Sequence, residues 1–92
     1  METHRTILVA NQQGVHGRVA TMLAKIAVAY DGEVLLQYKN EIVSCCSILD
    51  VLSLGLTQGS EIKVTAHGEK AEETLDKISQ ILTSATDPQP DN

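Results

Sequence analysis

Each regular segment of this 92-residue chain is apolar on one side only. In residues 61–66 apolar and polar residues alternate strictly, which is typical of a strand buried on one face. In residues 17–29 and 70–83 apolar residues recur every three or four positions, as in a helix with one buried stripe. Such strands and helices must cover one another to bury their apolar sides. The chain is therefore restricted to two layers around one core.

The predicted elements follow the order strand, helix, strand, strand, helix, strand, helix. Their expected ranges are 4–10, 17–29, 33–38, a short strand beginning at 42, 47–53, 61–66 and 70–83. This order favours an α+β fold, with a mostly antiparallel sheet and three helices on one face. We expect one domain over residues 1–83. Residues 84–92 are polar and contain two prolines, so we expect a disordered C-terminal tail.

Composition excludes several classes of function. The only aromatic residues are Tyr30 and Tyr38, and the net charge is −5 with a pI of about 5.0. Neither the base-stacking residues nor the basic surface of a nucleic-acid-binding protein is present. The sequence has no apolar run of about 18 residues and no signal-peptide pattern at Met1. We therefore expect a cytoplasmic monomer that binds neither nucleic acid nor membrane.

Neither the two cysteines nor the histidines at positions 4 and 67 indicate a bound cofactor. Cys45 and Cys46 are adjacent, and we interpret both as free thiols of a reducing compartment and as small buried strand residues. His4 and His67 have no metal-ligand spacing with any other residue, so no metal is expected. A chain of this size also has no room for a deep cavity that would hold a large cofactor.

The candidate site is the run Gly14-Val15-His16-Gly17-Arg18, between the first strand and the first helix. A helix N-terminus presents unpaired N–H groups and the positive end of a dipole, which together favour anions such as phosphate. Imidazole is a nucleophile, and a guanidinium binds phosphoryl oxygens through several donors. We interpret His16 as a phosphoryl acceptor and Arg18 as its phosphate-stabilising partner. The alternatives are a surface or capping histidine and a solvated arginine.

Three blocks of the chain resemble the histidine-containing phosphocarrier (HPr) family of the bacterial sugar phosphotransferase system. They are residues 14–18, residues 47–55 and residues 56–62, and the resemblance extends over about residues 4–83. It implies an open-faced β-sandwich with four antiparallel strands and three helices. It also implies a stoichiometric carrier, not an enzyme. Enzyme I, charged by phosphoenolpyruvate, would phosphorylate the histidine, at Nδ1 in this family, and an enzyme IIA-type domain would receive the group.

The second block predicts a helix cap and a surface for partners. Ser47 and Asp50 have the spacing of a capping box, so Ser47 is expected to cap a short helix. The resemblance adds a regulatory reading, in which an HPr serine kinase phosphorylates Ser47. It also makes Ile48, Leu49 and Leu52 a docking patch, where the alternative is burial in the core. Lys25 is a candidate for steering acidic partners or a plain solvated lysine.

Several residues depart from the family pattern, among them Gly17, where alanine or threonine is more common. Val19 stands where proline is usual, which restores an N–H and loosens the first helical turn. Cys46 precedes the serine, where kinase-regulated members carry a basic residue. Asp50 adds a negative charge close to any phosphoserine. These departures leave open a rival function, that of a diverged HPr-like regulatory protein that acts by binding partners.

Overall fold

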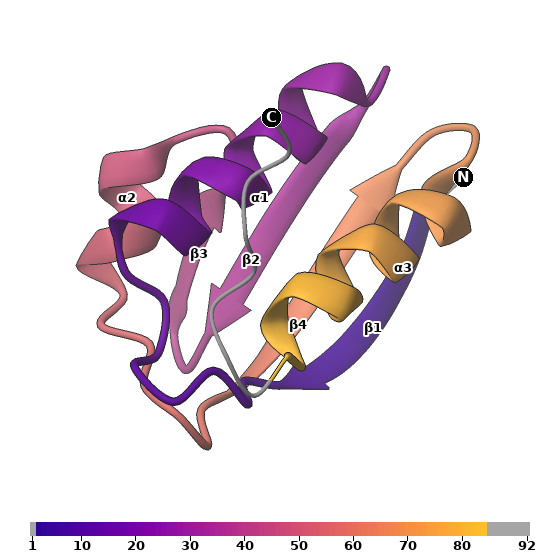
Figure 1. Ribbon diagram of the computed structural model, residues 1–92. Coiled ribbons are helices and arrows are strands. Elements are labelled where there is room, and N and C mark those ends of the chain that lie inside the picture. Colours follow the sequence, from indigo (N-terminus) through magenta and orange to yellow (C-terminus); the bar gives the residue numbers. More distant parts are fainter. Residues whose placement is uncertain (1, 85–92) are drawn as a thin grey trace.

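The computed structural model describes residues 2–84, which form a four-stranded sheet and three helices (Figure 1). The strands are β1 (Glu2–Leu8), β2 (Glu33–Tyr38), β3 (Glu41–Ser44) and β4 (Glu61–His67), and the helices are α1 (Gly17–Ala29), α2 (Ile48–Ser53) and α3 (Ala71–Leu82). This architecture confirms the predicted α+β class. Of the expected tail, 84–92, only Ser84 belongs to the described residues, so its predicted disorder lies outside them.

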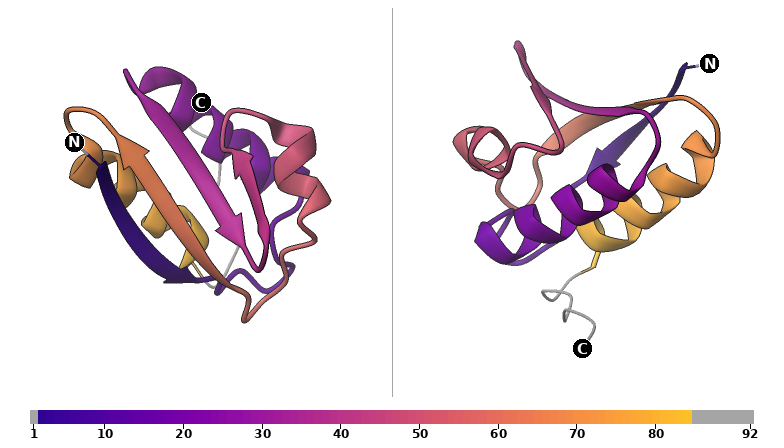
Figure 2. Two further views of the ribbon diagram at one scale, coloured as in Figure 1. Left: turned by 180° about the vertical axis from the view of Figure 1, so that it is seen from behind. Right: turned by 90° about the horizontal axis from the view of Figure 1, so that it is seen from above.

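The sheet is antiparallel throughout, with the strand order β1-β4-β2-β3. Leu36 of β2 lies between Val64 of β4 and Val43 of β3, and these side chains face the helices. Lys63 pairs with Thr6 and Gln37 in the neighbouring row, which faces away from the helices. One face of the sheet is therefore covered and the other is open to solvent (Figure 2).

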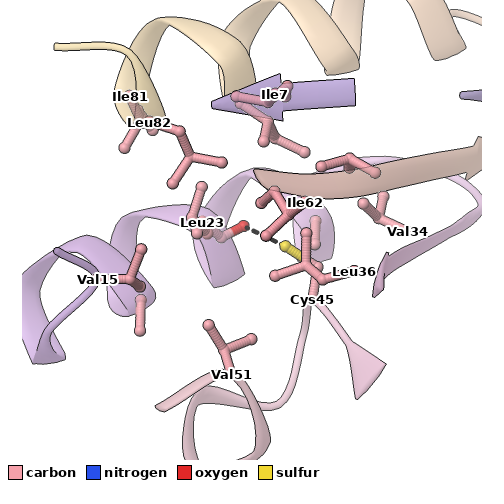
Figure 3. Packing of buried hydrophobic residues seen from close by; sticks show 14 of the residues in the cluster. Ile7, Val15, Leu23, Val34, Leu36, Cys45, Val51, Ile62, Ile81 and Leu82 are labelled. Carbon is pink, nitrogen blue, oxygen red and sulfur yellow. Dashed lines mark hydrogen bonds between the residues drawn. The ribbon is translucent and has the colours of Figure 1, made fainter. Parts of the chain in front are cut away.

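The core is almost entirely aliphatic because the chain has no tryptophan or phenylalanine. Leu23 of α1, Leu36 and Ile62 of the sheet and Leu75 of α3 are all buried in one cluster. Several of these side chains point toward one another between the helices and the sheet in Figure 3. α2 is the shortest helix, and it lies beside α1 and β3 and contributes Val51 to this cluster.

Element boundaries agree with the predictions to within a few residues. α1 and β2 occupy their predicted ranges, and α3 is one residue shorter at each end. β1 was expected over 4–10 but spans Glu2–Leu8. Val9 and Ala10 leave the sheet because their N–H groups bond to the carbonyls of Ser60 and Leu82, each at 2.8 Å. The apolar stripe predicted in residues 70–83 is buried, and the charged residues between its members are exposed; the stripe consists of Ala71, Leu75, Ile78 and Leu82.

The predicted burial of the cysteines is correct for Cys45 and wrong for Cys46, and neither residue lies in a strand as predicted. Both thiols are free, but Cys45 is buried and Cys46 is exposed. They follow β3 in a turn, where the Cys45 N–H reaches the Val34 carbonyl at 2.9 Å and the Cys46 N–H reaches Ser44 Oγ at 3.2 Å. This turn directs the two side chains to different environments. Burial raises the pKa of the Cys45 thiol to about 12, and the neighbouring Cys46 adds to the increase.

Candidate functional site

His16 is the N-cap residue of α1. Its backbone is extended, with φ −107° and ψ −172°, and its carbonyl accepts the first helical hydrogen bond from Ala20 at 2.9 Å. Its ring Nδ1 accepts a hydrogen bond from the Arg18 N–H at 3.3 Å. The imidazole is partly exposed. The structure therefore holds the lone pair of Nδ1 against the positive end of the helix, with the ring accessible from outside.

Arg18 lies in the first turn of α1 and is exposed. Within residues 2–84 its guanidinium makes no hydrogen bond or ion pair. Its five N–H donors are therefore available to a phosphoryl group bound nearby. The structure thus brings together the two residues predicted to form the centre of the site.

The two glycines beside His16 have different structural roles. Gly14 has a φ of +71°, and a Cβ there would overlap the Leu56 carbonyl oxygen and lie 2.8 Å from Thr57 Cα. Only glycine fits this position. Gly17 has ordinary helical geometry, and nothing lies within 4 Å of a Cβ placed on it. The close approach at Gly14 lets the Val15 N–H donate to the Leu56 carbonyl at 3.0 Å.

Two supports of the His16 loop were missed by the sequence analysis. One is the loop 54–60, whose residues Leu56 and Thr57 lie against Gly14 and Val15. This loop is itself closed by a 3.0 Å hydrogen bond from the Thr57 N–H to Ser60 Oγ. The other is Asn11, which is fully buried although it lies in a polar stretch that resembles an ordinary turn. The polar composition of residues 11–13 gives no indication of that burial.

Ser47 caps α2 as predicted, but only half of the capping box is present. Ser47 Oγ accepts from the Asp50 N–H at 3.4 Å. The Ser47 N–H donates to the Ser44 carbonyl at 3.1 Å and does not meet the Asp50 side chain, which is exposed. The turn after β3 thus takes the bond that the aspartate would make. The carboxylate of Asp50 remains on the surface of the first turn of α2.

The α2 patch, consisting of Ile48, Leu49 and Leu52, lies on the surface. Leu49 is 79% exposed and Ile48 is 36% exposed, while Leu52 is partly buried against the core. Val51 faces inward and is fully buried. α2 lies beside the first turns of α1 in Figures 1 and 2, and the two helices contact one another. The patch is therefore close to the end of α1 that carries His16.

Lys25 lies on the opposite flank of α1 from α2. It is exposed and lines a shallow hollow together with Lys70, the N-cap residue of α3, and Lys77 from the middle of that helix. The structure therefore separates Lys25 from the α2 patch. Its distance along α1 also places it two helical turns beyond Arg18, since each turn contains 3.6 residues.

The other two histidines lie on the sheet, away from the α1 terminus. His4 is exposed on β1, and His67 Nε2 lies 3.4 Å from a carboxylate oxygen of Glu2. Within residues 2–84, no cluster of three or more histidine, cysteine or acidic side chains could hold a metal ion. Over the same range, no helix has the length and the apolar run needed to span a membrane.

Comparison with known proteins gives one consistent result. The chain matches the family model described as "PTS HPr component phosphorylation site" over residues 3–84. It is 28% identical to HPr-C-His from Thermoanaerobacter tengcongensis, with a TM-score of 0.83 and coverage of 90% of this chain and 93% of that one. HPr from Bacillus anthracis has the same fold, with 24% identity, a TM-score of 0.81 and coverage of 86% and 94%.

A third similar structure is Crh, a catabolite repression protein of Bacillus subtilis. It is 25% identical, with a TM-score of 0.70 and coverage of 87% of this chain and 92% of that one. Crh was crystallised as a dimer with a swapped domain. The same architecture thus occurs both in proteins named as phosphocarriers and in one named for regulation.

Proposed function

The chain belongs to the HPr family of the phosphotransferase system, and from this premise we propose that His16 accepts a phosphoryl group from enzyme I, which is charged by phosphoenolpyruvate. His16 then passes the group to an enzyme IIA-type domain. Proteins of this family are phosphocarriers and not catalysts that turn over small molecules. In this proposal the chain is a stoichiometric, cytoplasmic intermediate that needs no cofactor.

The observation that carries the proposal is the placement of Nδ1 of His16 at the N-terminus of α1. In the acceptance step, the lone pair of Nδ1 attacks phosphorus and the bond from phosphorus to the donor breaks, so that the donor keeps that electron pair. The Arg18 N–H, now 3.3 Å from Nδ1, would then face a phosphoryl oxygen. The helix dipole and the Arg18 guanidinium would offset its negative charge. Onward transfer reverses these steps toward the next acceptor.

We propose that the partners dock on the α2 patch. Leu49 is a large apolar side chain that is mostly exposed, on a helix beside the His16 site. Exposed apolar residues that are grouped in this way are typical of protein-binding surfaces. Enzyme I and the IIA domain would use the patch in turn, since each must reach the same imidazole. Lys25 would act at longer range, by attracting acidic partners.

Ser47 is proposed as a regulatory site only in second place. Its Oγ is the cap of α2 in the unmodified protein, and a helix N-terminus tolerates a phosphate. The Asp50 carboxylate in the same turn opposes a second negative charge. Incubation with an HPr kinase, followed by mass mapping, tests this site. An unmodified Ser47 would remove the regulatory role.

The main test is phosphoenolpyruvate-dependent phosphorylation with enzyme I. We expect wild type and His4→Ala to take up an acid-labile phosphoryl group and His16→Ala to take up none. His4 is the matched control because it is an exposed histidine on the sheet. Arg18→Lys should accept more slowly, because one ammonium cannot reproduce the planar donors of arginine. Uptake by His16→Ala would refute the assignment.

Onward transfer separates the carrier from its rival. A carrier passes the phosphoryl group to a IIA domain and returns to the unmodified state. A regulatory relative of the kind left open by Val19, Cys46 and Asp50 would accept the group, or bind partners, without passing it on. Size-exclusion chromatography of the same samples tests the expected monomer against a dimer.

A further inference from the structure

We infer that Asn11 is a positioning residue for phosphoryl transfer: it fixes the loop that carries His16 to the carboxyl end of α3. The inference rests on the proposed function of His16. Asn11 itself touches neither the imidazole nor any group that would transfer phosphorus. It acts through the backbone that leads from residue 11 to the cap of α1.

The first step is the attachment of Asn11 to α3. The side-chain Nδ2 donates to the carbonyls of Ile81 and Ser84, both at 2.9 Å. The N–H of the preceding residue, Ala10, donates to the Leu82 carbonyl at 2.8 Å. The last carbonyls of a helix have no partner within the helix. The loop before α1 supplies these partners, so the end of α3 and the His16 loop form one hydrogen-bonded unit.

The second step leads from Asn11 to His16. The Asn11 carbonyl accepts from the Gly14 N–H at 3.0 Å, which closes a turn whose first residue is Asn11. Val15 follows Gly14 and is bonded to the Leu56 carbonyl. His16 is the next residue and has a fixed place as the cap of α1. A shift of Asn11 therefore changes the start of the turn that ends two residues before the imidazole.

An asparagine at position 11 has an energetic cost as well as a use. Asn11 is fully buried, and its Oδ1 has no hydrogen-bond partner within residues 2–84. A buried acceptor without a partner opposes folding. An apolar residue would avoid that cost but would remove the two hydrogen bonds that Asn11 Nδ2 donates to the Ile81 and Ser84 carbonyls. A single amide nitrogen with two hydrogens serves both carbonyls. This arrangement points to a requirement for a fixed loop and not for packing alone.

The His16 loop has a second support, the loop 54–60, which is separate from its attachment to α3. The Val9 carbonyl accepts from the Gly59 N–H at 2.8 Å, and the loop 54–60 also holds Val15. Without the Asn11 side chain, the His16 loop would keep this support but would be bonded to α3 only through the Ala10 N–H. Small displacements of reacting groups lower rates strongly, by up to about a hundredfold for 1 Å. Loss of Asn11 should therefore affect transfer more than it affects folding.

The test compares Asn11→Ala, Asn11→Asp and Asn11→Ser with wild type. The aspartate keeps the size of the side chain but presents an oxygen to the two carbonyls, and the serine keeps one donor. Ile78→Val is the control, because it perturbs the buried side of α3 and removes none of the hydrogen bonds between α3 and the loop. For each variant we would measure the melting temperature and, well below it, the second-order rate constant for phosphoryl acceptance from enzyme I.

We expect acceptance to slow about tenfold or more in Asn11→Ala and Asn11→Asp, and less in Asn11→Ser. Ile78→Val should transfer at the wild-type rate even though its melting temperature falls. Folded Asn11 variants that all transfer at the wild-type rate would overturn the inference. A wild type that accepts nothing would instead refute the proposed function.

Hydrogen exchange on the wild type keeps the inference testable if the variants do not fold. If the loop and α3 are one unit, the amides of Ala10, Gly14 and Val15 should become exposed in the same opening event and show similar protection. A Val15 amide that exchanges many times faster than the Ala10 amide would show that the attachment to α3 does not fix the loop, and the inference would fall.

Discussion

Replacement of Gly14 by alanine should destabilise the protein by about 2 kcal/mol. An alanine at the observed φ of +71° costs about 1–2 kcal/mol. Its Cβ would overlap the Leu56 carbonyl, so the 3.0 Å bond from the Val15 N–H would break or lengthen, at about 1 kcal/mol. The restricted unfolded chain returns about 0.4–1 kcal/mol. The balance remains clearly unfavourable.

Gly17→Ala is the matched control on the other side of His16. Its new Cβ would meet nothing within 4 Å, and its backbone is helical. Alanine is favoured over glycine in a helix by up to about 1 kcal/mol, so this variant should be neutral or more stable than wild type. The same chemical change should thus have opposite effects at positions 14 and 17.

Urea denaturation followed by far-UV circular dichroism measures both variants. For a domain of this size the free energy of unfolding falls by about 1 kcal/mol per molar urea. The midpoint should therefore move down by about 2 M for Gly14→Ala and stay level or rise for Gly17→Ala. If Gly14→Ala were as stable as wild type, the close approach between the His16 loop and Leu56 would not determine the conformation of the site.

Further predictions concern α2 and the two cysteines. Leu49→Ala should leave the free energy of unfolding within about 0.5 kcal/mol of wild type and weaken partner binding, whereas Val51→Ala should cost about 2 kcal/mol; urea denaturation and titration with enzyme I test both. Ser47→Ala should cost about 1 kcal/mol, measured in the same way, because α2 loses its cap. A thiol reagent should label Cys46 in the folded protein and Cys45 only after unfolding, as mass spectrometry would show. Burial raises the pKa of Cys45 from 9.0 to about 12, so its contribution to stability is complete below pH 9 and is lost as the pH rises toward 12, by up to about 1.4 kcal/mol per pH unit. In Cys45→Val the free energy of unfolding should fall less steeply between pH 9 and 12 than in wild type. Equal slopes against pH for the variant and wild type would contradict the raised pKa of Cys45.

The sequence predicted the features that depend on local periodicity. Apolar residues recur at a regular spacing within α1 and within β4. This spacing identifies both the type of element and its buried side. The cap of α2 was also predicted from Ser47, because a cap depends on a few neighbouring residues. The family resemblance added the open-faced arrangement of the sandwich and the expected partners, enzyme I and an enzyme IIA-type domain.

Features that depend on contacts between distant segments could not be predicted in this way. The burial of Asn11 arises from carbonyls at the end of α3, and the conformation of Gly14 is fixed by Leu56. Cys46 was predicted to be a small buried strand residue, but β3 ends at Ser44 and the turn that follows leaves Cys46 exposed. For Asn11 and Gly14 the deciding partner lies outside the window in which a periodic pattern is visible.

The open side of the sheet has a consequence for how this domain can change and be used. The His16 loop, α2 and the core all lie on the helical side, so on the other side Lys63 is exposed and Gln37 is only half-buried. Substitutions there alter little of the architecture, which fits a TM-score of 0.83 at only 28% identity. A fluorescent label or a solid support could be attached on the same side. Phosphoryl acceptance and onward transfer could then be measured without blocking either partner.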